Sequence, residues 1–171
     1  MQKAQDPRNP QRAHALARRL AAMEEDLPPR IPDPARRTPG KGAVRLTSRP
    51  RRVLVVEDDL DSVHALAYLV RSFGHEVEYA INGYVVLDIA ARFRPDVVLL
   101  DLGLPGMDGY EVCRRLKHDP QHAATHVIVV TAYSHEEHRA KARAAGCDLY
   151  VVKPVAPEAL FALLEAPSAS A

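Results

Sequence analysis

Several features that define common protein classes are missing from this chain of 171 residues. It has only two cysteines, Cys113 and Cys147, and no CxxC pair, so we expect no disulfide framework and a reducing compartment. No apolar run approaches the ~18 residues of a membrane span, and the amino terminus has no apolar signal-peptide core. A P-loop and a dinucleotide-binding glycine motif are also missing. We therefore expect a cytoplasmic protein with no membrane partner.

The net charge of the chain is small, but its charged residues are unevenly distributed. The net charge of +1 hides a first segment, residues 1–52, with 13 Lys/Arg and 5 Asp/Glu, a net of +8. Residues 53–171 hold 10 Lys/Arg and 17 Asp/Glu, a net of −7. The sequence thus predicts a basic arm followed by an acidic globular part.

The first segment also holds 8 of the 14 prolines. We predict a basic, Pro-rich arm over residues 1–50 that is largely disordered. Residues 11–26 differ, because Leu16, Leu20 and Met23 form an apolar stripe typical of a short helix. Two interpretations stay open: a solvated, partly helical tail, or a docking or dimerisation helix. Without interleaved aromatic residues or a recognition helix, nucleic acid is not an expected partner.

From residue 51 onward, short apolar runs alternate with helical stripes. The runs predict strands, and the stripes predict helices between them. Strict alternation with short loops is typical of an α/β fold, a doubly wound five-stranded parallel sheet with helices on both faces. We assign residues 51–166 to this domain and residues 167–171 to a short disordered tail. The expected strands are 53–56, 77–80, 97–100, 127–130 and 149–152, and the expected helices are 63–73, 85–93, 110–116, 136–145 and 157–164.

Polar residues follow four of these strands directly. Glu57 and Asp58 come after the first strand, Asp101 after the third, Thr131 after the fourth and Lys153 after the fifth. Neighbouring strands lie ~4.8 Å apart, so the carboxyl ends of the first and third strands can bring their carboxylates into contact. Carboxylates this close repel each other unless a cation is present. Hard oxygen ligands with open positions suit Mg²⁺.

These residue types suit phosphoryl transfer onto a carboxylate. Asp101 would attack in line, while a metal ion and the ammonium of Lys153 neutralise the charge that develops on the phosphoryl oxygens. Thr131 and Lys153 could then bind the acyl phosphate. An Asp after a strand can also simply favour a turn, but four matching strand ends make a shared site the stronger hypothesis.

The motifs at these strand ends resemble those of a known family. Residues 52–164 resemble the receiver domain of bacterial two-component response regulators. The resemblance implies a flavodoxin-like sheet of order 2-1-3-4-5, an order for which a member of this family is a standard example. The matching motifs are Val-Leu-Val-Val-Glu57-Asp58-Asp59, Leu-Leu-Asp101-Leu-Gly-Leu-Pro-Gly-Met-Asp108-Gly109, Val-Val-Thr131-Ala132 and Tyr150-Val-Val-Lys153-Pro154.

The resemblance also implies a phosphorylation switch. Asp101 would accept a phosphoryl group from a sensor histidine kinase or histidine phosphotransfer protein. Glu57, Asp58, Asp101 and the backbone carbonyl of Gly103 would hold Mg²⁺. Thr131 and Lys153 would bind the phosphoryl group, and Tyr150 would be the switch aromatic that rotates inward and changes the partner-binding surface. Tyr150 could equally be a strand core residue.

Two positions that tune phosphoryl lifetime in such domains are Gly103 and Tyr133, and a bulky Tyr133 could screen attacking water. Glu57 stands where Asp is more usual. Few residues follow the last helix, so we expect a stand-alone receiver without an output domain. It would act on a downstream protein target, and a phosphorylation-dependent homodimer is a further expectation.

Two alternatives remain. The first is a receiver-like docking module that acts without phosphorylation. The second is an aspartyl-phosphate phosphatase, but that class uses a second Asp two residues after the nucleophile, where this chain has Gly103. We therefore expect a phosphoacceptor with at most slow self-dephosphorylation and not an enzyme.

The histidines offer no metal site of recognised spacing. His135 and His138 flank two glutamates, which is not the zinc-protease spacing, and a solvated helix is expected there. His118, His122 and His126 surround a loop, so we predict surface side chains, with weak metal binding as the minor alternative.

Overall fold

The computed structural model describes residue 47 and residues 49–166. The predicted basic arm with its helix over 11–26, and the predicted tail over 167–171, lie outside the described residues. Across the described part of the chain, no helix has the length and apolarity needed to cross a bilayer.

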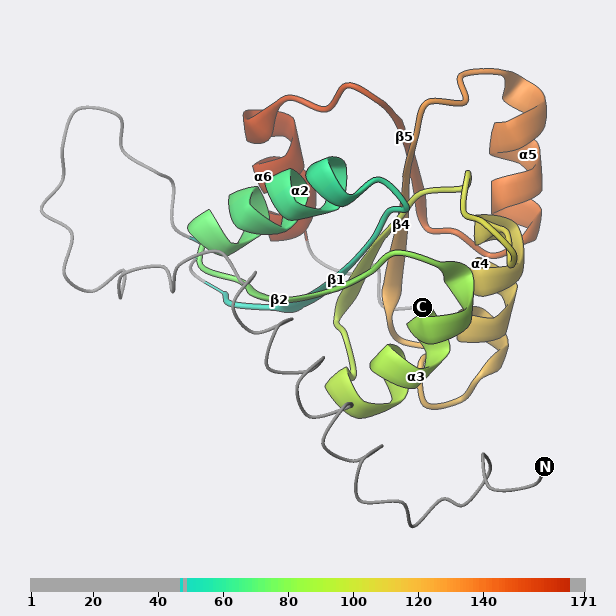
Figure 1. Ribbon diagram of the computed structural model, residues 1–171, viewed down its shortest axis with the longest axis horizontal. Helices are drawn as coiled ribbons and strands as arrows, with labels where there is room; N and C mark the ends of the chain where they lie inside the picture. Colours follow the sequence, from blue (N-terminus) through green and yellow to red (C-terminus); the bar gives the residue numbers. More distant parts are fainter. Residues whose placement is uncertain (1–46, 48, 167–171) are drawn as a thin grey trace, which may run out of the picture. The chain divides into compact units, whose positions relative to one another are not determined.

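Within residues 49–166, five strands and five helices alternate, as the sequence predicts (Figure 1). Most boundaries agree with the predicted ones to within one or two residues, and the first three of these helices begin one to three residues earlier than predicted. The strands are β1 (Arg52–Val56), β2 (Glu76–Ala80), β3 (Val97–Leu100), β4 (His126–Thr131) and β5 (Leu149–Val152). The helices are α2 (Leu60–Ser72), α3 (Gly83–Phe93), α4 (Gly109–His118), α5 (Glu136–Ala144) and α6 (Pro157–Glu165).

The strands form one parallel sheet in the order β2-β1-β3-β4-β5, which confirms the predicted fold class (Figure 1). The strand order reverses between β1 and β3, where the chain passes from one half of the sheet to the other. Ligands of open α/β sheets bind outside the carboxyl ends of the strands at such a point.

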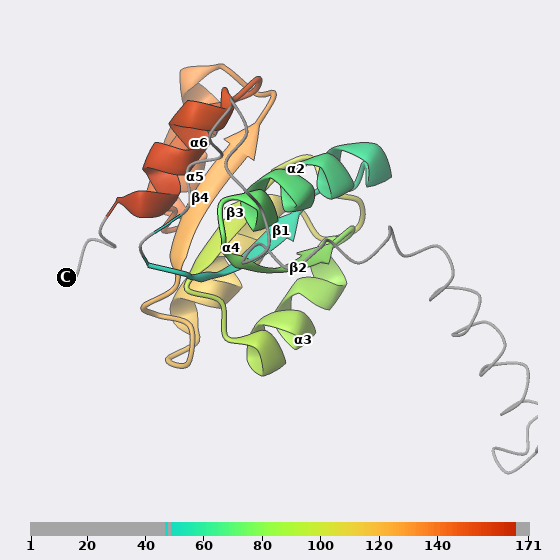
Figure 2. The same cartoon turned by 90° about the vertical axis from the view of Figure 1, so that its left-hand side faces the viewer.

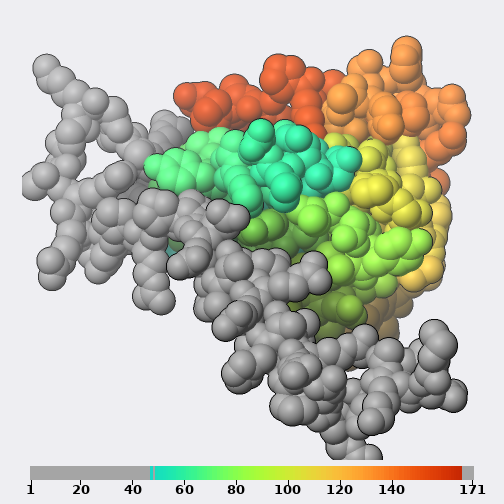
Figure 3. All heavy atoms as spheres, viewed as in Figure 1, coloured from blue at the N-terminus to red at the C-terminus, as the bar shows by residue number. Residues whose placement is uncertain are grey.

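Each face of the sheet has its own hydrophobic core, because successive strand residues point to opposite faces. Val53 and Val55 of β1 pack with α2 and α6, whereas Leu54 and Val56 pack with α3 and α4. Figure 2 shows α2 and α6 on one side of the sheet and α3 on the other. In the space-filling view, the atoms of α2 lie between those of α3 and those of α6 (Figure 3). A sheet covered on both faces leaves its strand ends as the place for polar chemistry.

Short polar residues fix where the helices begin. The side chain of Asp59 accepts a hydrogen bond from the Ser62 N–H at 2.8 Å, and Asp108 accepts one from the Glu111 N–H at 2.8 Å. These are helix N-caps, which satisfy N–H groups that have no partner within the helix. Asp59 is therefore a cap for α2.

The amino edge of the sheet corrects one prediction. His122 and His126 are buried, with 3% and 9% of their surface exposed, and only His118 is an exposed side chain. The His126 ring lies 3.5 Å from a carboxylate oxygen of Asp148, which also pairs with Lys117 at 2.6 Å. The loop between α4 and β4 is anchored by the Thr125 hydroxyl, which donates to the Pro95 carbonyl at 2.9 Å, a tertiary contact that local spacing does not reveal.

Candidate functional site

The ladder of the sheet continues one residue beyond the strands and places the candidate site residues. The Glu57 N–H donates to the Ala80 carbonyl at 3.1 Å, and the Asp101 N–H donates to the Val56 carbonyl at 2.9 Å. In the same way, the Lys153 N–H donates to the Thr131 carbonyl at 2.8 Å. The backbone at each position is therefore held by the sheet, and the side chains project from its carboxyl edge.

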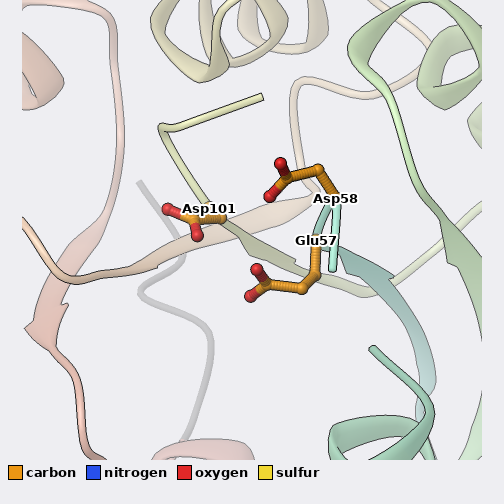
Figure 4. Close-up of side chains that lie close together, drawn as sticks. All are labelled: Glu57, Asp58 and Asp101. Carbon is orange, nitrogen blue, oxygen red and sulfur yellow. The ribbon is translucent and has the colours of Figure 1, made fainter. Parts of the chain in front are cut away.

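Three carboxylates meet at this edge. Oxygens of Glu57, Asp58 and Asp101 lie within 4.8 Å of one another, and Figure 4 shows the three groups around a shared space. Glu57 and Asp101 are 5% and 9% exposed, whereas Asp58 is exposed to solvent. The cluster thus has a buried side, formed by two strands, and an open side.

Lys153 supplies the positive charge. Its ammonium donates to Asp101 Oδ2 at 2.8 Å and also donates to Glu57 Oε2. Burial alone would lower the pKa of Lys153, but its bonds to the two carboxylates outweigh burial and raise that pKa. Lys153 therefore remains charged and bridges the two buried carboxylates. The peptide bond that follows it, to Pro154, is cis.

The two buried carboxyl groups differ in acidity. Burial raises the pKa of Glu57, and Lys153 only partly offsets this effect. Burial also works to raise the pKa of Asp101, but interactions with Lys153, with Thr131 and with the Gly103 N–H prevail and lower it. Asp101 is thus the better stabilised anion of the pair.

The orientation of the Asp101 carboxylate is fixed by the backbone that follows it. Oδ1 accepts hydrogen bonds from the Leu102 N–H at 2.6 Å and the Gly103 N–H at 3.2 Å, while Oδ2 accepts from Lys153. Both oxygens are therefore engaged, and the carboxylate is held in one rotamer.

The donor set fits a hard divalent cation. Oxygen ligands from one or two carboxylates, with solvent able to complete the coordination, are what Mg²⁺ requires. The raised pKa of Glu57 is a sign of uncompensated negative charge and burial that a cation would relieve. Across the described residues this is the one cluster of three acidic, histidine or cysteine side chains close enough to share an ion. The exposed backbone of Gly103 borders the same space.

The remaining predicted residues lie on the β4 and β5 side. Thr131 ends β4 with 1% exposure, one strand away from Asp101. Tyr150 in β5 is half-buried, and its hydroxyl donates to the Tyr133 carbonyl at 2.8 Å. The guanidinium of Arg139 lies 4.7 Å from the centre of the Tyr150 ring. The predicted residues are thus gathered at one edge, and Tyr150 is tied to the loop after β4.

Sequence reasoning missed two neighbours of this loop. The His138 ring stacks on the Tyr133 ring at 4.5 Å between centroids and 15° between planes. Its Nδ1 lies 2.7 Å from the Tyr110 hydroxyl. The prediction of a solvated helix is correct for the exposed His135 but wrong for the half-buried His138. The one sequence feature that could have indicated this stack is the spacing of the two residues: Tyr133 precedes the start of the helix, and His138 follows five positions later in its first turn. That feature is a weak signal.

Comparison with known proteins agrees with this geometry. The response regulator receiver domain matches residues 53–165. The polar-differentiation response regulator DivK of Brucella anthropi is 35% identical over 62% of this chain and 86% of DivK. Protein PilH of Pseudomonas aeruginosa is 33% identical over 67% of this chain and 95% of PilH. Response regulator PleD of Caulobacter vibrioides is 38% identical, but the chain spans about a quarter (24%) of PleD.

Solved structures show the same relationship. The BeF3-activated receiver domain of DrrB superposes with a TM-score of 0.62 and 32% identity, over 68% of this chain and 96% of that one. The receiver domain of sensor histidine kinase PA1611 from Pseudomonas aeruginosa, described with a magnesium ion coordinated in its active site cleft, has a TM-score of 0.64 and 27% identity. It covers 68% of this chain and 96% of that one.

Proposed function

Because this chain belongs to the response regulator receiver domain family, we propose that it is a phosphorylation-dependent switch of a two-component phosphorelay, with Asp101 as the phosphoacceptor. The observation that carries the proposal is the contrast between the two buried carboxyl groups that share Lys153: only Asp101 has a lowered pKa, and its orientation is fixed by hydrogen bonds from the Leu102 and Gly103 N–H groups. A carboxylate that stays ionised and oriented is what an in-line nucleophile needs.

In the proposed reaction an oxygen of Asp101 forms a bond to the phosphorus of a phosphohistidine or small acyl phosphate. The bond from phosphorus to the donor breaks, and the leaving group takes that electron pair. The ammonium of Lys153, which already donates a hydrogen bond to Asp101, neutralises negative charge on the oxygens of the transferred phosphoryl group. Glu57, Asp58, Asp101 and the Gly103 carbonyl would hold Mg²⁺, which supplies further positive charge when bound.

The switch itself would involve the β4 and β5 side. Thr131 would move to bind the phosphoryl group, and Tyr150 would turn inward in response. That turn requires the Tyr150 hydroxyl to leave the Tyr133 carbonyl, its partner at 2.8 Å. Gly103 and Tyr133, which border the site, would set how long the phosphoryl group survives.

The proposal extends to partners. A sensor histidine kinase or histidine phosphotransfer protein would supply the phosphoryl group, and a downstream protein target would bind the switched surface. A phosphorylation-dependent homodimer is compatible with the same switch. We propose a cytoplasmic phosphoacceptor that dephosphorylates itself slowly at most and does not act as an enzyme on other substrates.

The test is phosphorylation by acetyl phosphate with and without Mg²⁺, comparing the unmodified chain with Asp101→Asn. We expect a Mg²⁺-dependent gain of one phosphoryl group by intact mass, absent from the variant. Asp96→Asn is the matched control, since Asp96 lies at the opposite edge and its carboxylate accepts a bond from the Arg52 N–H at 2.7 Å.

Two results would overturn the proposal. No modification of the full chain by acetyl phosphate or by phosphorylated kinases would leave a docking module. Continuous phosphate release with rapid turnover would point to a phosphatase instead. A change in size-exclusion elution on phosphorylation would add evidence for the homodimer.

A further inference from the structure

We propose that His138 is a positioning residue that prolongs the life of the aspartyl phosphate by holding Tyr133 over the mouth of the site. The inference rests on the proposed phosphoacceptor function and adds two residues, His138 and Tyr110, that the motifs do not assign. It begins from the stack of His138 on Tyr133, at 4.5 Å and 15°.

Tyr133 lies beside the loop that orients Asp101. A Cβ added to Gly103 would lie 3.7 Å from the Tyr133 hydroxyl oxygen, so the phenol end of the ring borders Gly103. Gly103 in turn donates its N–H to Asp101 at 3.2 Å. The Tyr133 ring therefore occupies space through which water could approach a phosphoryl group on Asp101.

The ring is otherwise poorly restrained. Tyr133 is 42% exposed and lies in the loop between β4 and α5, outside the three buried hydrophobic clusters. A side chain so exposed normally samples several rotamers. The stack with His138 and the proximity of Gly103 are what favour the orientation over the site, since the Tyr150 hydroxyl holds the Tyr133 backbone and not its ring.

His138 is itself held in place by Tyr110. Its Nδ1 lies 2.7 Å from the Tyr110 hydroxyl, and the Tyr110 ring is nearly parallel to the imidazole, at 12° and 6.5 Å. Tyr110 is in the first turn of α4 and His138 in the first turn of α5. A chain of contacts thus runs from the starts of α4 and α5 to the loop after the phosphoacceptor. Its members, in order, are Tyr110, His138, Tyr133 and Gly103.

The expected effect follows from the strength of an aromatic pair. Loss of the stack should release the Tyr133 ring and raise the hydrolysis rate of the aspartyl phosphate roughly two- to tenfold. His138→Phe keeps a flat ring and should retain most of the lifetime, whereas His138→Gln keeps a polar group without a ring and should shorten it as His138→Ala does. Tyr110→Phe, which removes only the hydrogen bond, should fall between.

The experiment follows the loss of the phosphoryl group by intact mass after removal of acetyl phosphate at constant Mg²⁺. The variants are His138→Ala, His138→Phe, His138→Gln, Tyr110→Phe, Tyr133→Ala and the double variant of Tyr133 and His138. His118→Ala is the control, because this exposed histidine of α4 has its hydrogen bond within its own helix, at the Arg114 carbonyl. Thermal unfolding confirms that each variant is folded, and imidazole proton shifts report the stack directly.

A positioning role predicts that His138→Ala has no effect once Tyr133 is alanine. Additive effects, or a lifetime for His138→Ala equal to that of His118→Ala, would overturn the inference while the phosphoacceptor function stands. So would an unchanged lifetime for Tyr133→Ala. If the unmodified chain accepts no phosphoryl group at all, the proposed function fails and this inference fails with it.

Discussion

At the amino edge of the sheet the carboxylates of Asp96 and Asp148 each accept from a strand N–H and pair with a cation, whereas at the carboxyl edge three carboxylates surround a space reached by one lysine. Asp96 accepts from the Arg52 N–H and pairs with the Arg52 guanidinium at 3.4 Å. Asp148 accepts from the Val127 N–H at 2.7 Å and pairs with Lys117 at 2.6 Å. Both edges contain acidic and basic side chains, but those at the amino edge stabilise the fold, whereas those at the carboxyl edge form the candidate site.

The difference shows how to separate structural acids from chemical ones. A carboxylate that satisfies an otherwise unpaired N–H contributes to folding, because burying that N–H without a partner costs free energy. Among the residues that the structure describes, no strand N–H donates to the carboxylates of Glu57 and Asp58, which lie close to another acid instead, an arrangement that costs electrostatic free energy until a cation arrives. The predictions below test this contrast, from the largest effect to the smallest.

The largest effect is expected on metal affinity. Asp58→Asn removes the exposed member of the cluster and should weaken Mg²⁺ binding roughly tenfold or more, since one charge at about 4 Å is lost. Isothermal titration with Mg²⁺ measures the change. Asp148→Asn, at the other edge, should bind Mg²⁺ like the unmodified chain, and equal weakening by both variants would remove the distinction between the edges.

A steric change near the phosphoacceptor comes next. A Cβ at Gly109 would lie 2.4 Å from the Asp101 carbonyl oxygen, so Gly109→Ala should lower the free energy of unfolding by roughly 3 kcal/mol. Gly103→Ala is the matched control, because its Cβ would meet only the Tyr133 hydroxyl, at 3.7 Å. Urea unfolding compares the two, and a stable Gly109→Ala would show that α4 can shift away from Asp101.

Deleting an acid should have opposite consequences at the two edges. Asp148→Ala leaves the Val127 N–H without its partner and should cost about 1–3 kcal/mol of stability. Without Mg²⁺, Asp58→Ala relieves repulsion and should leave stability unchanged or raise it by up to about 1 kcal/mol. Urea unfolding in EDTA tests both. Comparable destabilisation by the two variants would contradict the division into structural and chemical acids.

The smallest effect concerns pH and the buried histidines. Burial lowers the pKa of His75 and of His126 below the ordinary value of 6.5. The unfolded chain therefore binds more protons than the folded chain below pH 6.5, and stability is lost as pH falls through that value. Arg51 disfavours protonation of both rings, while Glu165 acts oppositely on His75 and Asp148 on His126.

Thermal unfolding between about pH 7.5 and about 5.5 should show this loss, and His75→Gln should reduce its slope. The raised pKa of Glu57 contributes in the opposite direction, but its contribution grows toward more acidic values. A midpoint that does not change with pH over this interval would show that the folded and unfolded chains bind equal numbers of protons, and therefore that burial does not lower the pKa of these imidazoles.

Much of the fold was predictable from sequence because short apolar runs and helical stripes are local signals. All five strands, their parallel direction and the placement of Asp101 followed from the runs and the residues directly after them, whereas the strand order was implied by the resemblance to receiver domains. Cys113 lies in a helix predicted from its apolar stripe and is 1% exposed in the core, with burial raising its thiol pKa to about 12. Residues whose environment comes from their own strand or helix were thus predicted well.

What failed depends on contacts between distant segments. His122 and His126 looked like surface residues around a loop, yet both are buried, and the carboxylate beside His126 comes from Asp148, directly before β5. The stack of His138 on Tyr133 depends on the angle between α5 and β4, and the spacing of residues in the sequence does not determine that angle. Nor could the motifs say that Lys153 bridges Glu57 and Asp101, because that depends on rotamers at three strand ends.

The contacts of Lys153 with Glu57 and Asp101 also determine which part of the molecule is affected first when the pH falls. Lys153 keeps the pKa of Asp101 low, so this carboxylate stays anionic well into the acid range. The imidazoles at the other edge take up protons at milder acidity, once the fold loosens around them. As the pH falls, the fold should therefore lose stability while the Asp101 carboxylate is still ionised. Phosphorylation would then stop because the protein unfolds and not because the proposed nucleophile is protonated.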